Sequence, residues 1–285
     1  MIILKNEPMS GHTSFKIGGP ARVFMQPESH EEMVDIIDKL QCESARFMVM
    51  GNGSNLLFAD GGFNGAVIKT DKIDGIEIDG EQITVDCGVL LSRVASVACE
   101  AGLSGLEFAA GIPGSIGGAI YMNAGAYGGE MSQVVKSSVW MSDFGVISTI
   151  DNAGHGFGYR KSIFNENNGI LLRTTLKLNK GNKGEIKAEM KELAARRREK
   201  QPLDLPSAGS AFKRPKDGYA AQLIEECGLK GLSVGGAMVS PKHSGFIVNT
   251  GGATAADVMK LVKMVKEKVL EEKGIELEEE IRCVS

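Results

Sequence analysis

The sequence predicts an α+β protein with more than one domain. Short runs of β-branched residues alternate with segments whose apolar residues recur at helical spacing. Glycine is the outlier in composition, with 37 of 285 residues, against roughly 7% in average proteins. The composition changes at Gly181, where a charged helix is expected, and we therefore place a domain boundary near residue 180.

Composition and charge exclude several classes of function. A net charge of −4 argues against nucleic acid as the main partner, because nucleic-acid-binding surfaces are usually basic. The five cysteines are scattered without a CxxC pair, so neither a zinc site nor a disulfide framework is predicted. No window holds the roughly 18 uninterrupted apolar residues of a membrane span, and the apolar N-terminal run is too short for a signal peptide. We expect a cytoplasmic protein with no metal and no membrane insertion.

A first glycine loop follows a predicted helix and strand. Ser29 and Glu32 form a capping box ahead of apolar residues at helical spacing, and Arg46–Met50 is predicted as a strand. This strand leads directly into Gly51–Asn55, whose backbone N–H groups could hold phosphate. A dinucleotide-binding fingerprint would need glycine at Leu56, and no Walker A motif occurs.

Strands are predicted through much of the next hundred residues. Asp-Gly pairs at 74–75 and 79–80 separate β-branched runs between Ala66 and Asp86, which is typical of hairpins. Leu90–Gly102 is predicted as a helix that ends at its glycine. Further strands are expected at Val134–Met141, Val146–Ile150 and Gly169–Leu178.

The second glycine loop, Gly111–Glu130, is the segment around which we expect the rest of the chain to be arranged. Seven of its twenty residues are glycine, and no long charged side chain occurs before Glu130. Successive bare N–H groups form an anion-binding nest without a lysine, so this loop suits a pyrophosphate. The alternative is a tight glycine turn at the corner of a sheet.

Beyond residue 180, helices are expected on either side of one buried strand. Ile281, Cys283 and Val284 indicate a final strand that enters the core. Pro202–Pro215 is expected to be a proline-punctuated loop. The helices are expected at Gly184–Gln201, Tyr219–Cys227 and Thr254–Glu272, and the buried strand at Ser244–Asn249.

Three places could carry chemistry once metal sites and serine-hydrolase sites are set aside. The four histidines lie far apart, and no GxSxG motif occurs. Arg160 lies beside a glycine-flanked turn, Ser210 stands among small residues near two cations, and Glu280 ends an acidic run yet has apolar neighbours. The simpler interpretations are a surface arginine, a turn-forming serine and a solvated acidic segment.

Six segments together carry a resemblance to a known family. They are His12–Ala21 (HTSFKIGGPA), Gly51–Asn55 (GNGSN), Gly105–Glu130, Tyr159–Phe164 (YRKSIF), Lys200–Pro215 and Glu276–Arg282 (ELEEEIR). In this order they resemble the MurB family, the UDP-N-acetylenolpyruvoylglucosamine reductases of peptidoglycan synthesis. The resemblance implies a vanillyl-alcohol-oxidase (PCMH) type FAD-binding fold in residues 1–180, with subdomains 1–65 and 66–180. Residues 181–285 would form the substrate-binding domain, whose last strand, 280–284, would reach the active site.

The resemblance also implies a non-covalent FAD, with NADPH as co-substrate. Arg160 and Glu280 match the pair that steadies the charged intermediate in this family, and Ser210 matches its proton donor. Substrate-binding groups are implied at Tyr159, Arg197, Lys200 and Arg214. FAD-binding positions are implied at Gly51, Asn52, Gly53, Ser54, Asn55, Ile112, Pro113, Gly114, Ser115, Gly118, Ala119, Asn123, Gly125 and Tyr127.

These residue types suit the implied reaction, the reduction of an enol ether that bears a carboxylate. Hydride addition to the terminal carbon leaves an enediolate, which a fixed cation such as Arg160 stabilises more than the starting carboxylate. The intermediate is a strong base, so the Ser210 hydroxyl can protonate it. An ionised Glu280 would oppose the anion, and we therefore expect it to be protonated through burial or to orient another group.

NADPH and substrate would use one pocket in turn, in a ping-pong sequence.

Two other functions compete with this interpretation. Another FAD oxidoreductase of the same fold, acting on an alcohol or a sugar acid, is disfavoured because Gly51–Asn55 offers no histidine for a covalent flavin. A non-catalytic scaffold is disfavoured because Arg160, Ser210 and Glu280 are all present.

The compact segment between Phe164 and Gly184 resembles the shorter MurB subclass, which lacks a substrate-closing tyrosine. The expected partners are small molecules, and we expect a monomer.

Overall fold

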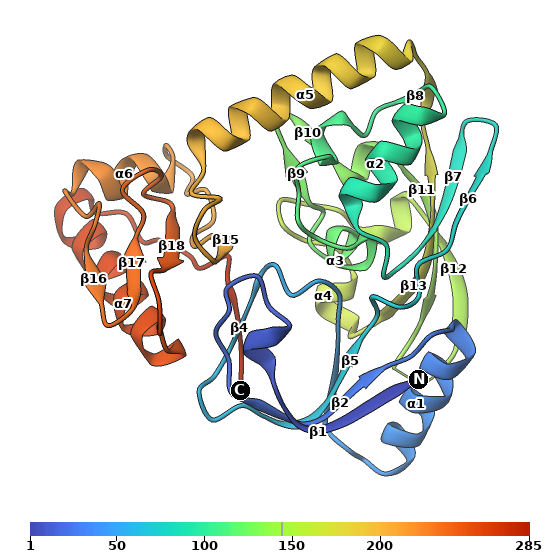
Figure 1. The fold of residues 1–285 in the computed structure, drawn as a ribbon, viewed down its shortest axis with the longest axis horizontal. Helices are drawn as coiled ribbons and strands as arrows, with labels where there is room; N and C mark the ends of the chain where they lie inside the picture. The colour runs from blue at the N-terminus through green and yellow to red at the C-terminus, as the bar shows by residue number, and fades with distance from the viewer. Residues whose placement is uncertain (144) are drawn as a thin grey trace. The chain divides into compact units, whose positions relative to one another are not determined.

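The computed structural model describes residues 1–143 and 145–285. Its contacts divide the chain into two compact units, each assembled from separate stretches of sequence (Figure 1). Unit 1 contains residues 1–3, 24–52 and 66–197, and unit 2 contains residues 4–23, 53–65 and 198–285. The functional boundary near residue 180 stays a prediction, because a compact unit is not the same thing as a ligand-binding domain.

Unit 1 is centred on an antiparallel sheet of five strands. They are β6 (Ile76–Asp79), β7 (Gln82–Asp86), β11 (Val135–Met141), β12 (Ile147–Asp151) and β13 (Ile170–Lys177), in the order β12-β11-β13-β7-β6. β6 and β7 form a hairpin in which Asp79 pairs with Gln82, so the second predicted Asp-Gly pair lies at the turn. Gly80 has a φ of +57° there, a conformation that costs residues with a Cβ about 1–2 kcal/mol.

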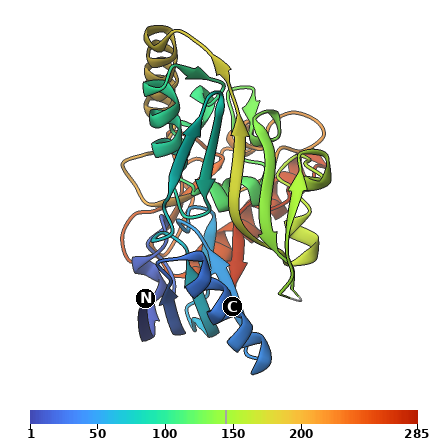
Figure 2. The same cartoon turned by 90° about the vertical axis from the view of Figure 1, so that its right-hand side faces the viewer.

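Two helices of unit 1 lie near this sheet, α2 (Leu91–Glu100) and α3 (Ile116–Tyr121) (Figures 1 and 2). α3 contacts both β7 and β13. Gly117 permits this approach, because a Cβ at that position would lie 3.1 Å from the carbonyl oxygen of Cys87. Burial raises the pKa of the Cys87 thiol to about 12, so this cysteine packs as an unreactive thiol beneath the helix.

A second sheet has the strands β1 (Ile2–Pro8), β2 (Pro20–Gln26), β5 (Phe63–Lys69) and β3 (Phe47–Met50), in that order. β3 pairs in parallel with β5 and ends immediately before the first glycine loop. The preceding helix, α1 (His30–Cys42), begins after Ser29, whose hydroxyl accepts the Glu32 N–H at 3.2 Å. The Glu32 carboxylate accepts the N–H of Glu28 at 2.9 Å, so the reciprocal half of the predicted capping box falls one residue early.

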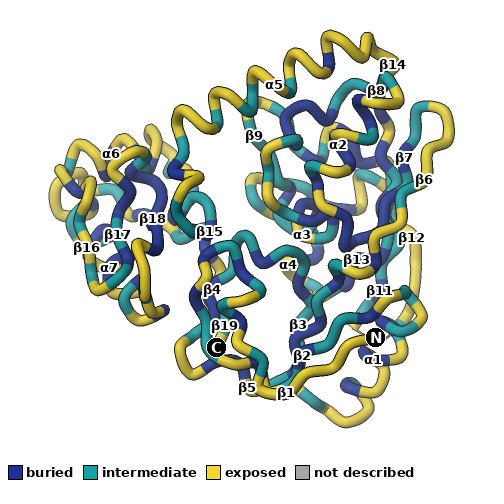
Figure 3. The backbone as a smooth tube through the Cα atoms, in the orientation of Figure 1, coloured by how far each residue is buried: buried dark blue, intermediate teal, exposed yellow. Residues whose placement is uncertain are grey.

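Unit 2 packs two helices around a small sheet. Its strands are β15 (Ser207–Ser210), β18 (Phe246–Asn249), β17 (Ala237–Val239) and β16 (Ser233–Val234), in that order, and its helices are α6 (Ala220–Glu226) and α7 (Ala255–Lys273). α7 contacts α6, β16 and β17. The core of unit 2 also includes Phe15, Ile17 and Leu57, which come from the N-terminal part of the chain. Figure 3 shows β17 and β18 as largely buried.

The remaining elements complete the two units. β4 (Leu56–Phe58) pairs in parallel with the last strand, β19 (Arg282–Val284), and α5 (Lys183–Lys200) is an exposed helix in which Ile186 is the buried residue. Among the described residues, no helix is both long and apolar enough to cross a membrane. The other elements are β8 (Leu103–Ser104) with β14 (Asn179–Lys180), β9 (Gly125–Ala126) with β10 (Gly129–Glu130), α4 (Phe164–Asn167), and the 3₁₀ turns Met9–Gly11, Glu107–Ala109, Met131–Gln133 and Ala153–His155.

Three segments differ from the sequence prediction. Ser207–Ser210, which was expected to be loop, is a strand, because it pairs with β18. The second glycine loop contains α3, which its glycine content alone disfavours and which Ser115 caps. The final strand begins at Arg282 rather than residue 280, and only Ile281 near it is buried, whereas Cys283 is exposed. For the two strands a partner distant in the sequence decides the structure, whereas α3 has a local cap in Ser115.

Asp60 caps α7 from outside the helix, and its removal should destabilise unit 2. Its carboxylate oxygens accept the N–H groups of Ala255 at 2.7 Å and Ala256 at 2.9 Å. Asp60→Ala removes both acceptors and a negative charge at the positive end of the helix. We expect the free energy of unfolding to fall by about 1–2 kcal/mol.

Urea denaturation measures this loss as a lower midpoint. Asp35→Ala, on the exposed side of α1, is the matched control and should leave the midpoint nearly unchanged. Equal midpoints for the two variants would contradict the capping role of Asp60.

Candidate active site

The two predicted phosphate-binding loops meet in unit 1. Gly51 lies so close to Ser115 that a Cβ on Gly51 would overlap the Ser115 hydroxyl oxygen. The Asn52 side-chain amide donates to the carbonyl of Pro113 at 2.6 Å. The contact depends on glycine at position 51, and it joins the end of β3 to the start of α3.

Several backbone N–H groups at this junction have no acceptor among the described residues. Ser115 caps α3 by accepting the Gly118 N–H at 3.3 Å. Within the described parts of the chain, however, the N–H groups of Asn52, Gly114 and Ser115 donate to no protein acceptor. Unused N–H groups beside a glycine that tolerates no side chain fit a phosphate or pyrophosphate. The junction therefore offers donors that suit the pyrophosphate of a dinucleotide.

Arg160 lies on a strained turn beside the same loop. Gly158 and Lys161 exchange two backbone hydrogen bonds, of 3.0 and 3.2 Å, around Tyr159 and Arg160. Arg160 has a φ of +55°, which costs a non-glycine residue on the order of 1–3 kcal/mol. Its guanidinium lies 5.2 Å from the centre of the Tyr159 ring, and one nitrogen is 3.5 Å from the Gly125 carbonyl oxygen. The fold thus holds a cation beside residues 123–127, which include three of the predicted FAD-binding positions.

Arg197 brings a second cation to the glycine loop. Its side chain packs against Gly111, where an added Cβ would be 3.0 Å from the arginine Cδ. Burial lowers the pKa of the Arg197 guanidinium, an effect that Tyr127 partly offsets. The neighbouring Arg196 pairs with the Glu192 carboxylate at 2.5 Å, whereas Arg197 takes part in none of the ion pairs found among the described residues. A half-buried arginine in this state suits an anionic ligand.

Ser210 and Glu280 lie on neighbouring segments of unit 2. The Glu280 N–H donates to the carbonyl of Ala211 at 2.9 Å, directly after Ser210. β15 carries one extra residue relative to β18 between Ser207 and Ser210, and Gly209 has a φ of +78° within this bulge. Bulges re-aim side chains, and the Ser210 hydroxyl here donates to the Phe212 carbonyl at 3.0 Å.

Two side chains fix this pair of segments. Asn55, predicted as a FAD-binding residue, donates from its amide to the Glu280 carbonyl at 3.0 Å. Ser14, to which the sequence analysis assigned no role, donates to the Ser207 carbonyl at 2.7 Å. Its own N–H donates to Gly53 at 3.3 Å. A serine in a polar motif gives no sequence signal for such a contact, because its acceptor lies 193 residues away.

The other predicted residues are spread over both units. Arg160 and Arg197 belong to unit 1, and Ser210, Glu280 and Lys200 belong to unit 2. The exposed residues are Pro113, Gly118, Tyr127, Tyr159, Lys200 and Arg214, of which Arg214 lies 4.8 Å from the Tyr219 ring. The buried ones are Gly53, Ser115, Ala119 and Asn123, and Ser54 and Ile112 are half-buried.

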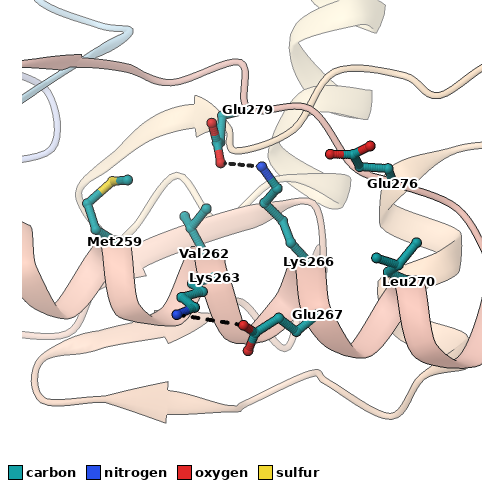
Figure 4. Close-up of a pocket in the computed structure, with 8 residues that line it drawn as sticks. All are labelled: Met259, Val262, Lys263, Lys266, Glu267, Leu270, Glu276 and Glu279. Carbon is teal, nitrogen blue, oxygen red and sulfur yellow. Dashed lines mark hydrogen bonds and ion pairs between the residues drawn. The ribbon is translucent and has the colours of Figure 1, made fainter.

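A shallow groove in unit 2 contains none of the predicted site residues. It lies between α7 and the segment 276–279 and has a volume of about 260 Å³ (Figure 4). The Lys266 ammonium pairs with the Glu279 carboxylate at 2.7 Å there. Among the residues that the structure describes, no cluster of three or more potential ligands could hold a metal ion.

Comparisons with known proteins identify both parts of the chain. Residues 21–144 match the family described as an FAD binding domain, and residues 201–284 match the C-terminal domain of UDP-N-acetylenolpyruvoylglucosamine reductase. Reductases of that name from Caldanaerobacter subterraneus subsp. tengcongensis and Clostridium tetani are 50% and 47% identical to this chain over 279 residues. These alignments cover 98% of this chain and 92% and 91% of the two relatives.

A solved structure agrees with these sequence matches. The crystal structure of UDP-N-acetylenolpyruvylglucosamine reductase (MurB) from Thermus caldophilus is similar to this chain with a TM-score of 0.84 and 38% identity. The alignment covers 100% of this chain and 98% of that one. The predicted fold class is therefore confirmed, with an FAD-binding domain ahead of a MurB-type C-terminal domain. The chain belongs to the MurB family of UDP-N-acetylenolpyruvoylglucosamine reductases.

Proposed function

We propose that this chain reduces UDP-N-acetylenolpyruvoylglucosamine with electrons from NADPH, using bound FAD, in the synthesis of peptidoglycan precursors. The observation that carries the proposal is identity of 46–50% to reductases of that name over 98–99% of the chain. We place the enzyme in the cytoplasm, because scattered cysteines in odd number suit a reducing compartment.

The N–H groups of Asn52, Gly114 and Ser115 would hold the pyrophosphate of FAD. They need no lysine, because backbone amides stabilise phosphate oxygens through several short hydrogen bonds. Bound FAD would supply the two-electron chemistry, hydride transfer from NADPH to the enol ether. The protein's part is to bind the cofactor and the substrate, exclude water and manage charge and protons.

Arg160 would stabilise the negative charge that develops on the substrate. Hydride addition turns the substrate carboxylate and its neighbouring carbon into an enediolate, which bears more charge on oxygen than the carboxylate did. A fixed guanidinium stabilises that state preferentially, and loss of such a donor typically costs about 10²- to 10³-fold in rate. The strained turn supports this role, because backbone strain persists where the surrounding structure enforces it.

Ser210 would give its proton to the enediolate carbon, with Glu280 beside it. In the structure the Ser210 hydroxyl donates to the Phe212 carbonyl at 3.0 Å, so the O–H must rotate toward the substrate before it can give up the proton. Glu280 is half-buried, and its carboxyl group would be protonated in the complex or orient another group. Tyr159, Arg197, Lys200 and Arg214 would bind the substrate, the three cations through its diphosphate.

Substrate-driven oxidation of the flavin tests the proposal directly. Adding UDP-N-acetylenolpyruvoylglucosamine to the anaerobic, NADPH-reduced protein should restore the absorbance of oxidised flavin, because the enol ether accepts hydride. UDP-N-acetylglucosamine, which lacks the enolpyruvyl group, is the matched control and should leave the flavin reduced. A flavin that stays reduced with both until air is admitted would refute this function and favour an oxidase of the same fold.

Gly51→Ala should lower the affinity for FAD about ten- to hundred-fold, because its methyl group would push Ser115 away and overpacking costs about 1–3 kcal/mol. Titration of the apoprotein with FAD, followed by flavin fluorescence, measures the change. Gly61→Ala is the matched control, since an added Cβ meets no atom within 4 Å there. Equal FAD affinities in the two variants would place the pyrophosphate elsewhere.

Ser210→Ala should keep FAD and its reduction by NADPH, and lower the rate of substrate-driven oxidation about 10²- to 10⁴-fold, the usual contribution of a general acid. Stopped-flow absorbance separates the two half-reactions. Ser207→Ala, three residues earlier on β15, should retain most of the rate. A Ser210→Ala enzyme as fast as the parent would show that another group delivers the proton.

A further inference from the structure

The turn that carries Arg160 does not hold its conformation by itself. Arg160 has a left-handed φ of +55°, which an arginine in a free loop would leave. Two backbone hydrogen bonds between Gly158 and Lys161, of 3.0 and 3.2 Å, close the turn around Tyr159 and Arg160. The orientation of the guanidinium therefore depends on what fixes the two ends of the turn.

Asn123 fixes the first end. Its side-chain amide donates to the Gly158 carbonyl at 3.0 Å, and its side-chain oxygen accepts the Ser132 N–H at 2.9 Å. Asn123 is 1% exposed and has a φ of +41°, a conformation that asparagine tolerates better than most residues. The residue is thus a buried clamp whose two polar atoms both bond to backbone.

Ser162 fixes the second end. Its hydroxyl donates to the Tyr121 carbonyl at 2.8 Å, and its N–H donates to the side-chain oxygen of Asn165 at 2.8 Å. The Ser162 side chain is fully buried. Both ends of the turn are therefore tied to residues 121–123 at the end of α3, two residues before Gly125, the residue that Arg160 approaches.

We propose that Asn123, assisted by Ser162, is a positioning residue that acts through Arg160. It holds the Gly158 carbonyl so that the turn stays left-handed and the guanidinium stays beside Gly125. The inference rests on the proposed function, in which Arg160 stabilises the enediolate. It assigns Asn123 to the support of the catalytic cation rather than to direct contact with FAD.

Asn123→Asp tests this assignment. The variant keeps the size of the side chain and the acceptor for Ser132, but it loses the donor to Gly158 and sets a carboxylate oxygen against that carbonyl. The rate of substrate-driven flavin oxidation should fall about ten- to hundred-fold, as small displacements of a catalytic group do. When Arg160→Ala is already present, the same change should cost less than about two-fold, because residues that act through one another are not additive.

Other readouts separate positioning from a general structural effect. Reduction of the flavin by NADPH, the absorbance spectrum of bound FAD and the melting temperature of the apoprotein should all stay near the parent values. Asn249→Asp is the matched control, since that buried amide also donates to a backbone carbonyl, of Phe15 at 3.2 Å, while its side-chain oxygen accepts the Gly251 N–H at 2.9 Å. It lies outside the turn and should leave the substrate-driven rate within about two-fold of the parent.

If Asn123→Asp does not fold or does not bind FAD, Ser162→Ala replaces it as the test. Ser162→Ala should lower the rate of substrate-driven flavin oxidation by a smaller factor, and this loss should again nearly vanish when Arg160→Ala is present. Additive losses with Arg160→Ala, or equal slowing of both half-reactions, would overturn the inference. A parental rate in Arg160→Ala alone would overturn both the inference and the role of Arg160. A parent enzyme whose flavin the substrate does not oxidise would overturn the proposed function itself, which distinguishes the two failures.

Discussion

The contact between the two glycine loops of unit 1 depends on the absence of a side chain at Gly51. β3 delivers this residue against Ser115, and the Asn52 amide closes the contact onto Pro113 at 2.6 Å. Because α3 in turn rests on Cys87 through Gly117, two glycines set the distances from the sheet to the helix and from the helix to the loop. A Cβ at position 51 would force the loop away from Ser115, and a Cβ at position 117 would require a shift of a few tenths of an ångström between α3 and Cys87.

Strain is concentrated around the same loop. Asn123, Tyr127 and Arg160 all have positive φ angles although none is glycine. Each such angle carries a cost, so the surrounding hydrogen bonds must over-determine the backbone. The stability of the surrounding sheet offsets this cost and keeps the Arg160 guanidinium in a fixed orientation before any ligand binds. Electrostatic catalysis requires such preorganisation.

Local patterns predicted local structure well. The hairpin at Gly80 and the helix α7 follow from turn chemistry and from apolar spacing, and both are present. The two glycine loops were identified from composition, but their mutual contact was not, because 64 residues separate Gly51 from Ser115 and no side-chain pattern encodes it. The strand at Ser207–Ser210 and the clamp at Asn123 were missed for the same reason, since each depends on a partner distant in the sequence. Roles at Ser210 and Glu280 came from the family resemblance alone.

The interleaving of the chain limits how this protein can be divided or rearranged. α7 belongs to a core that is completed by Phe15, Ile17 and Leu57, and the closing strand β19 pairs with β4 from residues 56–58. A fragment that begins after α5 would expose that apolar surface and an open strand edge, so it would be prone to aggregate rather than fold. On the ribosome, residues 4–23 and 53–65 of unit 2 must therefore wait for the last residues, and a premature stop near the C-terminus would leave unit 2 without its closing strand.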